Sequence, residues 1–205
     1  MTSYNNKSKW KERYSQVILI MFCINTNVAF EQVVVNLLNK FNRLRVHYVV
    51  IGSYALELLL DIPIEWKDFD VYAWDPDPLK DYEFYEEILL NLDLLPSLHT
   101  HGIVALTQDN IPIEVIAPIG DFAIPLSILK KTINVNWKGI EVKTLEPEAI
   151  AVLKARAGRR LDYEQLRLLK NRLKTEKLHY YILSLGEADY IKRATRVLRE
   201  VGLLE

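Results

Sequence analysis

The chain has 205 residues, of which 50% are hydrophobic and 26% are charged, a composition typical of a globular protein with one or two compact units. Its formal net charge of −1 excludes a global attraction to nucleic acid or to an anionic membrane, so any polyanion contact requires a local patch. The single cysteine, Cys23, excludes an intramolecular disulfide and a cysteine-based metal site.

Residues 1–26 are predicted to form an N-terminal segment that is partly disordered. Its apolar run, Val17 to Cys23, is too short to span a bilayer, and the residues that follow make a poor signal-peptide cleavage site. We interpret the run as a buried strand or helical turn, and we predict a cytoplasmic protein with no membrane partner.

Residues 27–145 alternate between helical and strand patterns, which is typical of a mixed α/β domain. Apolar residues at three- and four-residue spacing, with capping and stop signals, predict helices over 27–43, 54–60 and 79–92. A continuous β-prone run predicts a strand over 46–51, and the next strand is predicted over 68–74, where Pro76 and Pro78 stop it. Two further strand pairs enclose turn-forming residues and predict hairpins over 102–106 with 111–117 and over 133–135 with 140–142.

Residues 146–205 are predicted to form a C-terminal helical region. Pro147 fits the first helical turn, and breaks are expected near Gly158 and Gly186. From Lys154 to Lys177, nine basic residues stand against three acidic ones. This stripe indicates either a phosphate or RNA contact, or a solvated helix face with ion pairs between neighbouring turns.

Carboxylates at three strand positions carry the strongest chemical signal. Asp68 and Asp70 are two residues apart, so on a strand they project to the same face. Like charges held that close repel each other unless a cation bridges them, and hard oxygen ligands suit Mg²⁺ or Mn²⁺. Glu114 stands in an otherwise apolar run, where an unpaired carboxylate is expensive to bury. The alternatives are a solvated strand end for the aspartates and a basic partner or wet sheet face for Glu114.

Gly52-Ser53 joins a predicted buried strand to a predicted helix. Glycine allows the backbone to approach a ligand, and a helix N-terminus offers free N–H groups to an anion. The pair is therefore a candidate phosphate seat, although a tight turn explains it equally well when it is taken alone.

In this order, Gly52-Ser53, Asp68-x-Asp70 and Glu114 resemble the nucleotidyltransferase superfamily of the polymerase-β type, over roughly residues 28 to 175. Small prokaryotic members, including AbiEii-type toxins, are the most similar. The resemblance implies an α+β fold whose mixed β-sheet has helices on one side and is followed by a C-terminal helical region. It also implies two divalent ions, Mg²⁺ or Mn²⁺, held by the catalytic carboxylates of Asp68, Asp70 and Glu114.

The same resemblance assigns nucleotide-binding residues, which are Gly52, Ser53, Lys67 and Lys154. Asp162 is expected to position a basic side chain. Three positions depart from the family pattern. Lys67 is the only basic residue just before the aspartates, Tyr54 follows Gly-Ser, and Gln165 stands where many relatives have an aspartate.

The predicted reaction transfers a nucleoside monophosphate from a nucleoside triphosphate such as ATP to an acceptor hydroxyl on tRNA, protein or a small molecule. The resemblance also allows a toxin role with an antitoxin protein as partner. Two alternatives remain: a member of the fold that binds nucleotide or a partner without turnover, and a Mg²⁺-dependent phosphohydrolase. His99 and His101 have strand-like metal spacing, but no third ligand is evident, so we predict a loop or surface pair.

Overall fold

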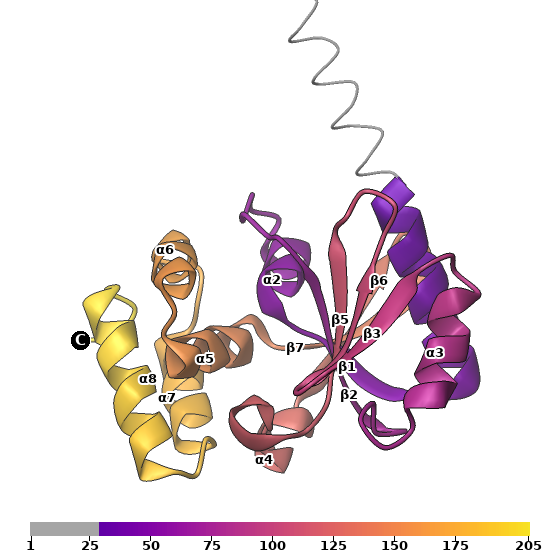
Figure 1. Ribbon diagram of the computed structural model, residues 1–205. Coiled ribbons are helices and arrows are strands. Elements are labelled where there is room, and N and C mark those ends of the chain that lie inside the picture. Colours follow the sequence, from indigo (N-terminus) through magenta and orange to yellow (C-terminus); the bar gives the residue numbers. More distant parts are fainter. Residues whose placement is uncertain (1–28) are drawn as a thin grey trace, which may run out of the picture.

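The structure is a computed structural model that describes residues 29–205 (Figure 1). The predicted segment 1–26, with its apolar run from Val17 to Cys23, lies outside the described residues. The described chain opens with a helix over residues 29–44, close to the predicted 27–43.

Seven strands make one sheet: β1 (His47–Val50), β2 (Phe69–Asp75), β3 (Leu95–His99), β4 (Gly102–Leu106), β5 (Pro112–Ile116), β6 (Thr132–Trp137) and β7 (Ile140–Leu145). Their order across the sheet is β3-β4-β5-β2-β1-β7-β6. The pairs β2–β5 and β1–β7 are parallel, and the other neighbours are antiparallel, so the sheet is mixed. The predicted mixed α/β fold and both predicted hairpins are confirmed.

Helices and one short 3₁₀ turn connect and follow the strands: α2 (Gly52–Leu60), α3 (Tyr82–Leu90), η1 (Gly120–Phe122), α4 (Leu126–Leu129), α5 (Pro147–Ala157), α6 (Arg160–Leu168), α7 (Thr175–Leu183) and α8 (Ala188–Glu200). The predicted helical region after residue 145 is confirmed, with Pro147 in the first turn of α5 and Gly158 as its C-cap. Within residues 29–205, no helix has the length and apolar character needed to cross a membrane.

Side chains alternate along the strands, so one face of the sheet packs against helices and the opposite face carries the candidate carboxylates. Phe69, Val71 and Ala73 of β2 share one face, and Val50 and Tyr48 of β1 are the cross-strand partners of Val71 and Ala73. Aromatic rings of the 29–44 helix cover this face. Phe30 contacts Phe69 and Tyr54 of α2, whereas Phe41 contacts Tyr48 and Tyr85 of α3. The strand residues that alternate with Phe69, Val71 and Ala73 therefore project to the opposite face of the sheet.

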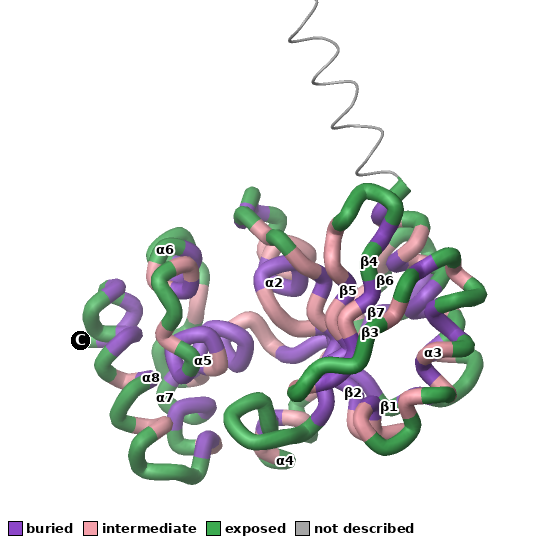
Figure 2. The backbone as a smooth tube through the Cα atoms, in the orientation of Figure 1, coloured by how far each residue is buried: buried purple, intermediate pink, exposed green. Residues whose placement is uncertain are grey.

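The helical region is assembled around α5, which is buried along most of its length (Figure 2). This helix contacts α2, α6, α7 and α8. Its start is tied to α7 because the Glu146 carboxylate accepts hydrogen bonds from Lys177 Nζ and Tyr181 Oη, both at 2.8 Å. The contact between α5 and α2 brings the helical region against the chemical end of the sheet.

Candidate functional site

Asp70 and Glu114 are direct neighbours across two parallel strands. The register of β2 and β5 pairs Asp70 with Glu114, while the adjacent pairs, Phe69 with Ile113 and Val71 with Val115, face the packed side. Asp68, predicted as the first residue of this strand, instead lies in the bend one residue before β2 begins. The structure thus brings the three predicted carboxylates to the lining of one cavity of about 590 Å³.

Gly52 begins α2 and lies directly against Asp70. Its φ of +76° is in the left-handed region, and a Cβ added there would meet Asp70 Oδ2 at 2.0 Å. The backbone N–H of the preceding Ile51 donates to the Asp70 carbonyl at 3.0 Å. The first N–H groups of a helix have no partner within the helix, so the start of α2 presents free donors beside the carboxylates.

Asp70 is electrostatically strained in the absence of a cation. Its pKa is raised to about 8, first by burial and then by the charges of Asp68 and Glu114, whereas the charges of Lys154 and Arg159 lower it. These carboxylates disfavour each other's ionised form, and a divalent cation would stabilise that form. Oxygen ligands suit Mg²⁺ or Mn²⁺. The chemical type of these side chains, carboxylate oxygen, therefore suits the metal that the sequence predicts.

The three side chains line the cavity without closing on one point. Among residues 29–205, no three carboxylate, imidazole or thiol groups converge closely enough to form a complete ligand set. The three carboxylates line one cavity and repel one another there. The number of bound ions stays a prediction.

The predicted nucleotide-binding residues Ser53 and Lys154 are bonded to each other and to Gln165. Lys154 Nζ donates to Gln165 Oε1 at 2.7 Å, to Ser53 Oγ at 3.0 Å and to Asp162 Oδ1 at 3.4 Å. Ser53 Oγ in turn donates to Gln165 Oε1 at 2.9 Å. All four side chains are buried, and burial lowers the pKa of Lys154. The three ammonium protons of Lys154 are thus directed at protein acceptors.

Arg159 is a cation at the cavity that the sequence placed only within a general basic stripe. Its Nε donates to Asp162 Oδ2 at 3.0 Å and its Nη2 donates to Oδ1 at 3.3 Å, while its side chain remains largely exposed. Asp162 thus positions a basic side chain, as the resemblance implies. Lys67, which the sequence predicted to bind the nucleotide, is exposed and lines the same cavity.

The far wall of the cavity comes from α5, α8 and the loop around η1. Arg156 of α5 donates to the carbonyls of Ala123 and Asp121, each at 2.8 Å. Its guanidinium also lies over the ring of Tyr190 of α8, whose hydroxyl donates to the Asp121 carboxylate. This wall joins loop and helices that are remote in sequence, and no local pattern could have indicated it.

His101 agrees with the predicted loop or surface pair in lying in a turn, but it also approaches Glu114, which the sequence did not indicate. It lies in the turn between β3 and β4, and its Nε2 is 3.5 Å from Glu114 Oε2. The ring of Phe122 stacks on it, with centroids 5.1 Å apart. The pairing of β4 with β5 is the reason, because it carries the turn to the edge of the cavity beside Glu114.

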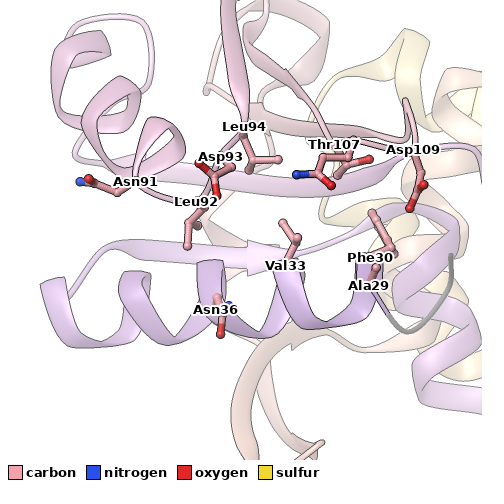
Figure 3. A pocket seen from close by; sticks show the side chains of 11 residues that line it. Ala29, Phe30, Val33, Asn36, Asn91, Leu92, Asp93, Leu94, Thr107 and Asp109 are labelled. Carbon is pink, nitrogen blue, oxygen red and sulfur yellow. The ribbon is translucent and has the colours of Figure 1, made fainter. Parts of the chain in front are cut away.

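A second cavity, of about 500 Å³, lies between the 29–44 helix and the chain that leads into β3 (Figure 3). Figure 3 shows Phe30 and Val33 of the helix facing Leu92, Leu94 and Thr107 across it. None of the three carboxylates reaches this cavity, so the carboxylate-lined cavity is the candidate site.

Comparison with known proteins gives one family and several similar folds. The profile of a family described as nucleotidyl transferases of unknown function matches residues 30–195. No curated protein matches the sequence.

Three solved structures are similar to the chain at low sequence identity. An antigenic nucleotidyltransferase-like protein from Paracoccidioides brasiliensis has a TM-score of 0.55 at 14% identity, over 84% of this chain and 87% of that one. A protein from Thermotoga maritima described as a nucleotidyltransferase has a TM-score of 0.49 at 20% identity, over 70% and 94%. The antibiotic-resistance factor ANT(2'')-Ia has a TM-score of 0.48 at 14% identity, over 82% and 90%.

Proposed function

Since the chain belongs to this family of nucleotidyl transferases, we propose that it transfers a nucleoside monophosphate from a nucleoside triphosphate to an acceptor hydroxyl, with Asp68, Asp70 and Glu114 as its metal-binding catalytic residues. The observation that carries the proposal is the register pairing of Asp70 with Glu114, next to the glycine that begins α2. Two carboxylates on adjacent strands beside a helix N-terminus suit a phosphate ester and its counter-ions.

The triphosphate would lie at the start of α2, where Gly52 and Ser53 line the cavity and Lys67 and Arg159 supply positive charge. Divalent ions, when bound, would neutralise charge on the triphosphate and on the leaving pyrophosphate. The acceptor oxygen would attack the α-phosphorus, a new P–O bond would form, and the bond to the pyrophosphate would break. Glu114 would take the hydroxyl proton.

Lys154 contributes indirectly in this proposal. Its ammonium is bonded to Ser53, Gln165 and Asp162, so it holds Ser53 and the start of α2 in place. Asp162 holds Arg159 in the same way. An antitoxin partner, a tRNA acceptor, ATP as the preferred nucleotide and a cytoplasmic location stay predictions from the sequence.

The test is a transfer assay with each α-³²P-labelled nucleoside triphosphate, Mg²⁺ or Mn²⁺, and a pool of RNA and protein. We expect labelled acceptor and released pyrophosphate with the wild type. Asp70→Asn and Glu114→Gln should lower the transfer rate at least about 100-fold, because each removes charge from the site at little change in size. Glu141→Gln, an exposed change on β7, is the matched control.

Free phosphate in place of pyrophosphate would replace the proposal with a phosphohydrolase. Metal-dependent nucleotide binding with no labelled product, across the whole pool, would favour a binding protein. An unchanged rate in both Asp70→Asn and Glu114→Gln would show that the chemistry lies elsewhere.

A further inference from the structure

Within residues 29–205, the one ion-pair contact of the Glu114 carboxylate is with His101, whose Nε2 lies 3.5 Å from Glu114 Oε2. The Glu114 side chain is 26% exposed and has three rotatable torsions, so without a partner its carboxylate would sample several orientations. A contact at Oε2 restricts this sampling and leaves Oε1 to bind an ion or a hydroxyl group. The surroundings of His101 therefore bear on the chemistry of Glu114.

The backbone of His101 is fixed against β5, the strand that carries Glu114. The His101 carbonyl accepts a hydrogen bond at 2.8 Å from the N–H of Ala117, which directly follows β5. The next residue, Gly102, has a φ of +148°, and a Cβ added there would meet the carbonyl oxygen of Val115 at 2.1 Å. Glycine at position 102 thus lets the turn before β4 lie close enough to β5 for the imidazole to reach Glu114.

The imidazole ring of His101 is held by a second element, the loop around η1. The ring of Phe122 stacks on it, with centroids 5.1 Å apart and an interplanar angle of 23°. The loop is anchored through its own backbone, because the buried Arg156 donates to the carbonyls of Asp121 and Ala123. Strand pairing and the packing of α5 against this loop together set the direction in which the imidazole points.

His99 shows that this placement is specific to His101. The two imidazoles belong to one hairpin, and their centroids are 6.0 Å apart. His99 is exposed, however, and its Nε2 contacts Ser97 Oγ at 3.0 Å. It ends β3, the edge strand, which is two places from β5 in the sheet. The chain therefore contains a matched imidazole that does not contact Glu114.

An imidazole suits the task of orienting a carboxylate that also binds a cation. In its neutral form it offers one N–H and adds no positive charge next to the ion. Loss of a hydrogen-bonding partner behind a metal ligand typically costs roughly 10- to 100-fold in metal affinity or activity. The 3.5 Å separation is long for a hydrogen bond, and contacts at catalytic groups often tighten when the substrates bind.

We infer that His101 is a positioning residue for Glu114, and that it holds one carboxylate oxygen so that the other can bind the divalent ion and accept the hydroxyl proton. The stack with Phe122 and the backbone contact with β5 hold His101 in place. This inference rests on the proposed function, because Glu114 needs one fixed orientation only if it acts in nucleotidyl transfer.

The test compares three variants of the full chain with the wild type. His101→Phe keeps a ring that can stack on Phe122 and loses the nitrogen. His101→Gln loses the ring and places an amide nitrogen the same number of bonds from the backbone as Nε2. His99→Phe is the matched control. Electron paramagnetic resonance measures binding of Mn²⁺ in the absence of nucleotide, the transfer assay gives kcat and KM for the triphosphate, and urea unfolding measures stability.

We expect His101→Phe to weaken Mn²⁺ binding and to lower kcat, each about tenfold, with KM for the triphosphate unchanged. His101→Gln should recover most of both losses, and His99→Phe should match the wild type. A role in packing alone predicts the opposite order, because phenylalanine keeps the stack that glutamine loses. The inference is overturned if His101→Phe binds Mn²⁺ and turns over as the wild type does, or if glutamine is no better than phenylalanine.

Failure of the proposed function has a different signature. A wild type that neither binds Mn²⁺ nor transfers any nucleotide would contradict the proposed function and this inference with it. A wild type that does both, and whose kcat and Mn²⁺ affinity survive in His101→Phe, would overturn the role of His101 alone.

Discussion

Lys154 and Gln165 form a buried pair in which the ammonium donates to the amide oxygen at 2.7 Å. The same oxygen accepts the Ser53 hydroxyl, and the amide nitrogen donates to the Glu65 carbonyl at 2.6 Å. One glutamine side chain therefore joins the start of α2, helix α5 and the segment that leads to Asp68. Neither carboxylate oxygen of an ionised aspartate or glutamate can act as the donor in this arrangement.

Replacing Gln165 by leucine should weaken both the fold and nucleotide binding. The change leaves a buried ammonium and a buried hydroxyl short of an acceptor, which costs about 1–3 kcal/mol of unfolding free energy. Gln165→Glu keeps the acceptor but loses the donor to Glu65, so it should retain affinity for the nucleotide better than leucine does and still lower the turnover rate. Urea unfolding and transfer kinetics measure the two effects, with the exposed Gln108→Leu as control. Equal nucleotide affinity and equal turnover in the leucine and glutamate variants would show that the amide does not act as both acceptor and donor.

Replacing Gly52 by alanine should abolish transfer through a local collision. The new methyl group would overlap Asp70 Oδ2, which lies 2.0 Å from the added Cβ, and the backbone is in the left-handed region. Gly139→Ala is a matched control, because its φ of +80° carries similar backbone strain while nothing lies within 4 Å of the added Cβ. Both variants should lose about 1 kcal/mol of stability from the backbone. Only Gly52→Ala should lose transfer activity, by about 100-fold or more, and comparable activities in the two variants would contradict the clash.

The sequence was sufficient to predict most elements because hydrophobic periodicity is strong in them. The helix over 29–44, strands β1 and β2, and both hairpins lie within a few residues of their predicted bounds. Strand β3 was missed, since its residues are mostly exposed and Pro96 interrupts the strand pattern. The break between α6 and α7 was missed as well, because no glycine or proline marks it.

The sequence predicted the carboxylates of the candidate site but not the residues that form the walls of its cavity. Asp68, Asp70 and Glu114 stand out because a charge in an apolar run has a local signature. Phe122 and Arg156 reach the cavity through packing of α5 against the loop around η1, and His101 reaches Glu114 through strand pairing; both arrangements are non-local. The departure at Gln165 was visible in the sequence, but its three partners lie 11, 100 and 112 residues away along the chain.

Arg159 and Arg160 are adjacent in sequence and should differ in nucleotide binding. Arg159 lines the cavity and is held by Asp162, whereas Arg160 is exposed and lies 3.9 Å from Glu164. We expect Arg159→Ala to weaken binding of ATP with Mg²⁺ about tenfold and to leave binding of adenosine unchanged, since the lost contact is to phosphate. Arg160→Ala should bind both ligands as the wild type does. Calorimetry would contradict the assignment if the two variants lost affinity equally.

The raised pKa of Asp70 predicts how the stability of the metal-free protein depends on pH. A carboxyl whose pKa rises from 3.8 to about 8 on folding holds its proton in the native state over that window, while the unfolded chain releases it. The native state then binds more protons, so the free energy of unfolding falls as pH rises, by at most about 1.4 kcal/mol per pH unit from this one group. Asp70→Asn removes the titrating group and should flatten the curve between pH 5 and pH 8, whereas Asp109→Asn, at an exposed position between β4 and β5, should not. Mg²⁺ favours the ionised carboxylate, so it should stabilise the wild type most at the high-pH end and have little effect on Asp70→Asn. Chemical denaturation in EDTA and in Mg²⁺ measures this, and parallel curves for the wild type and Asp70→Asn in EDTA would mean that Asp70 is ionised in the folded protein without a cation.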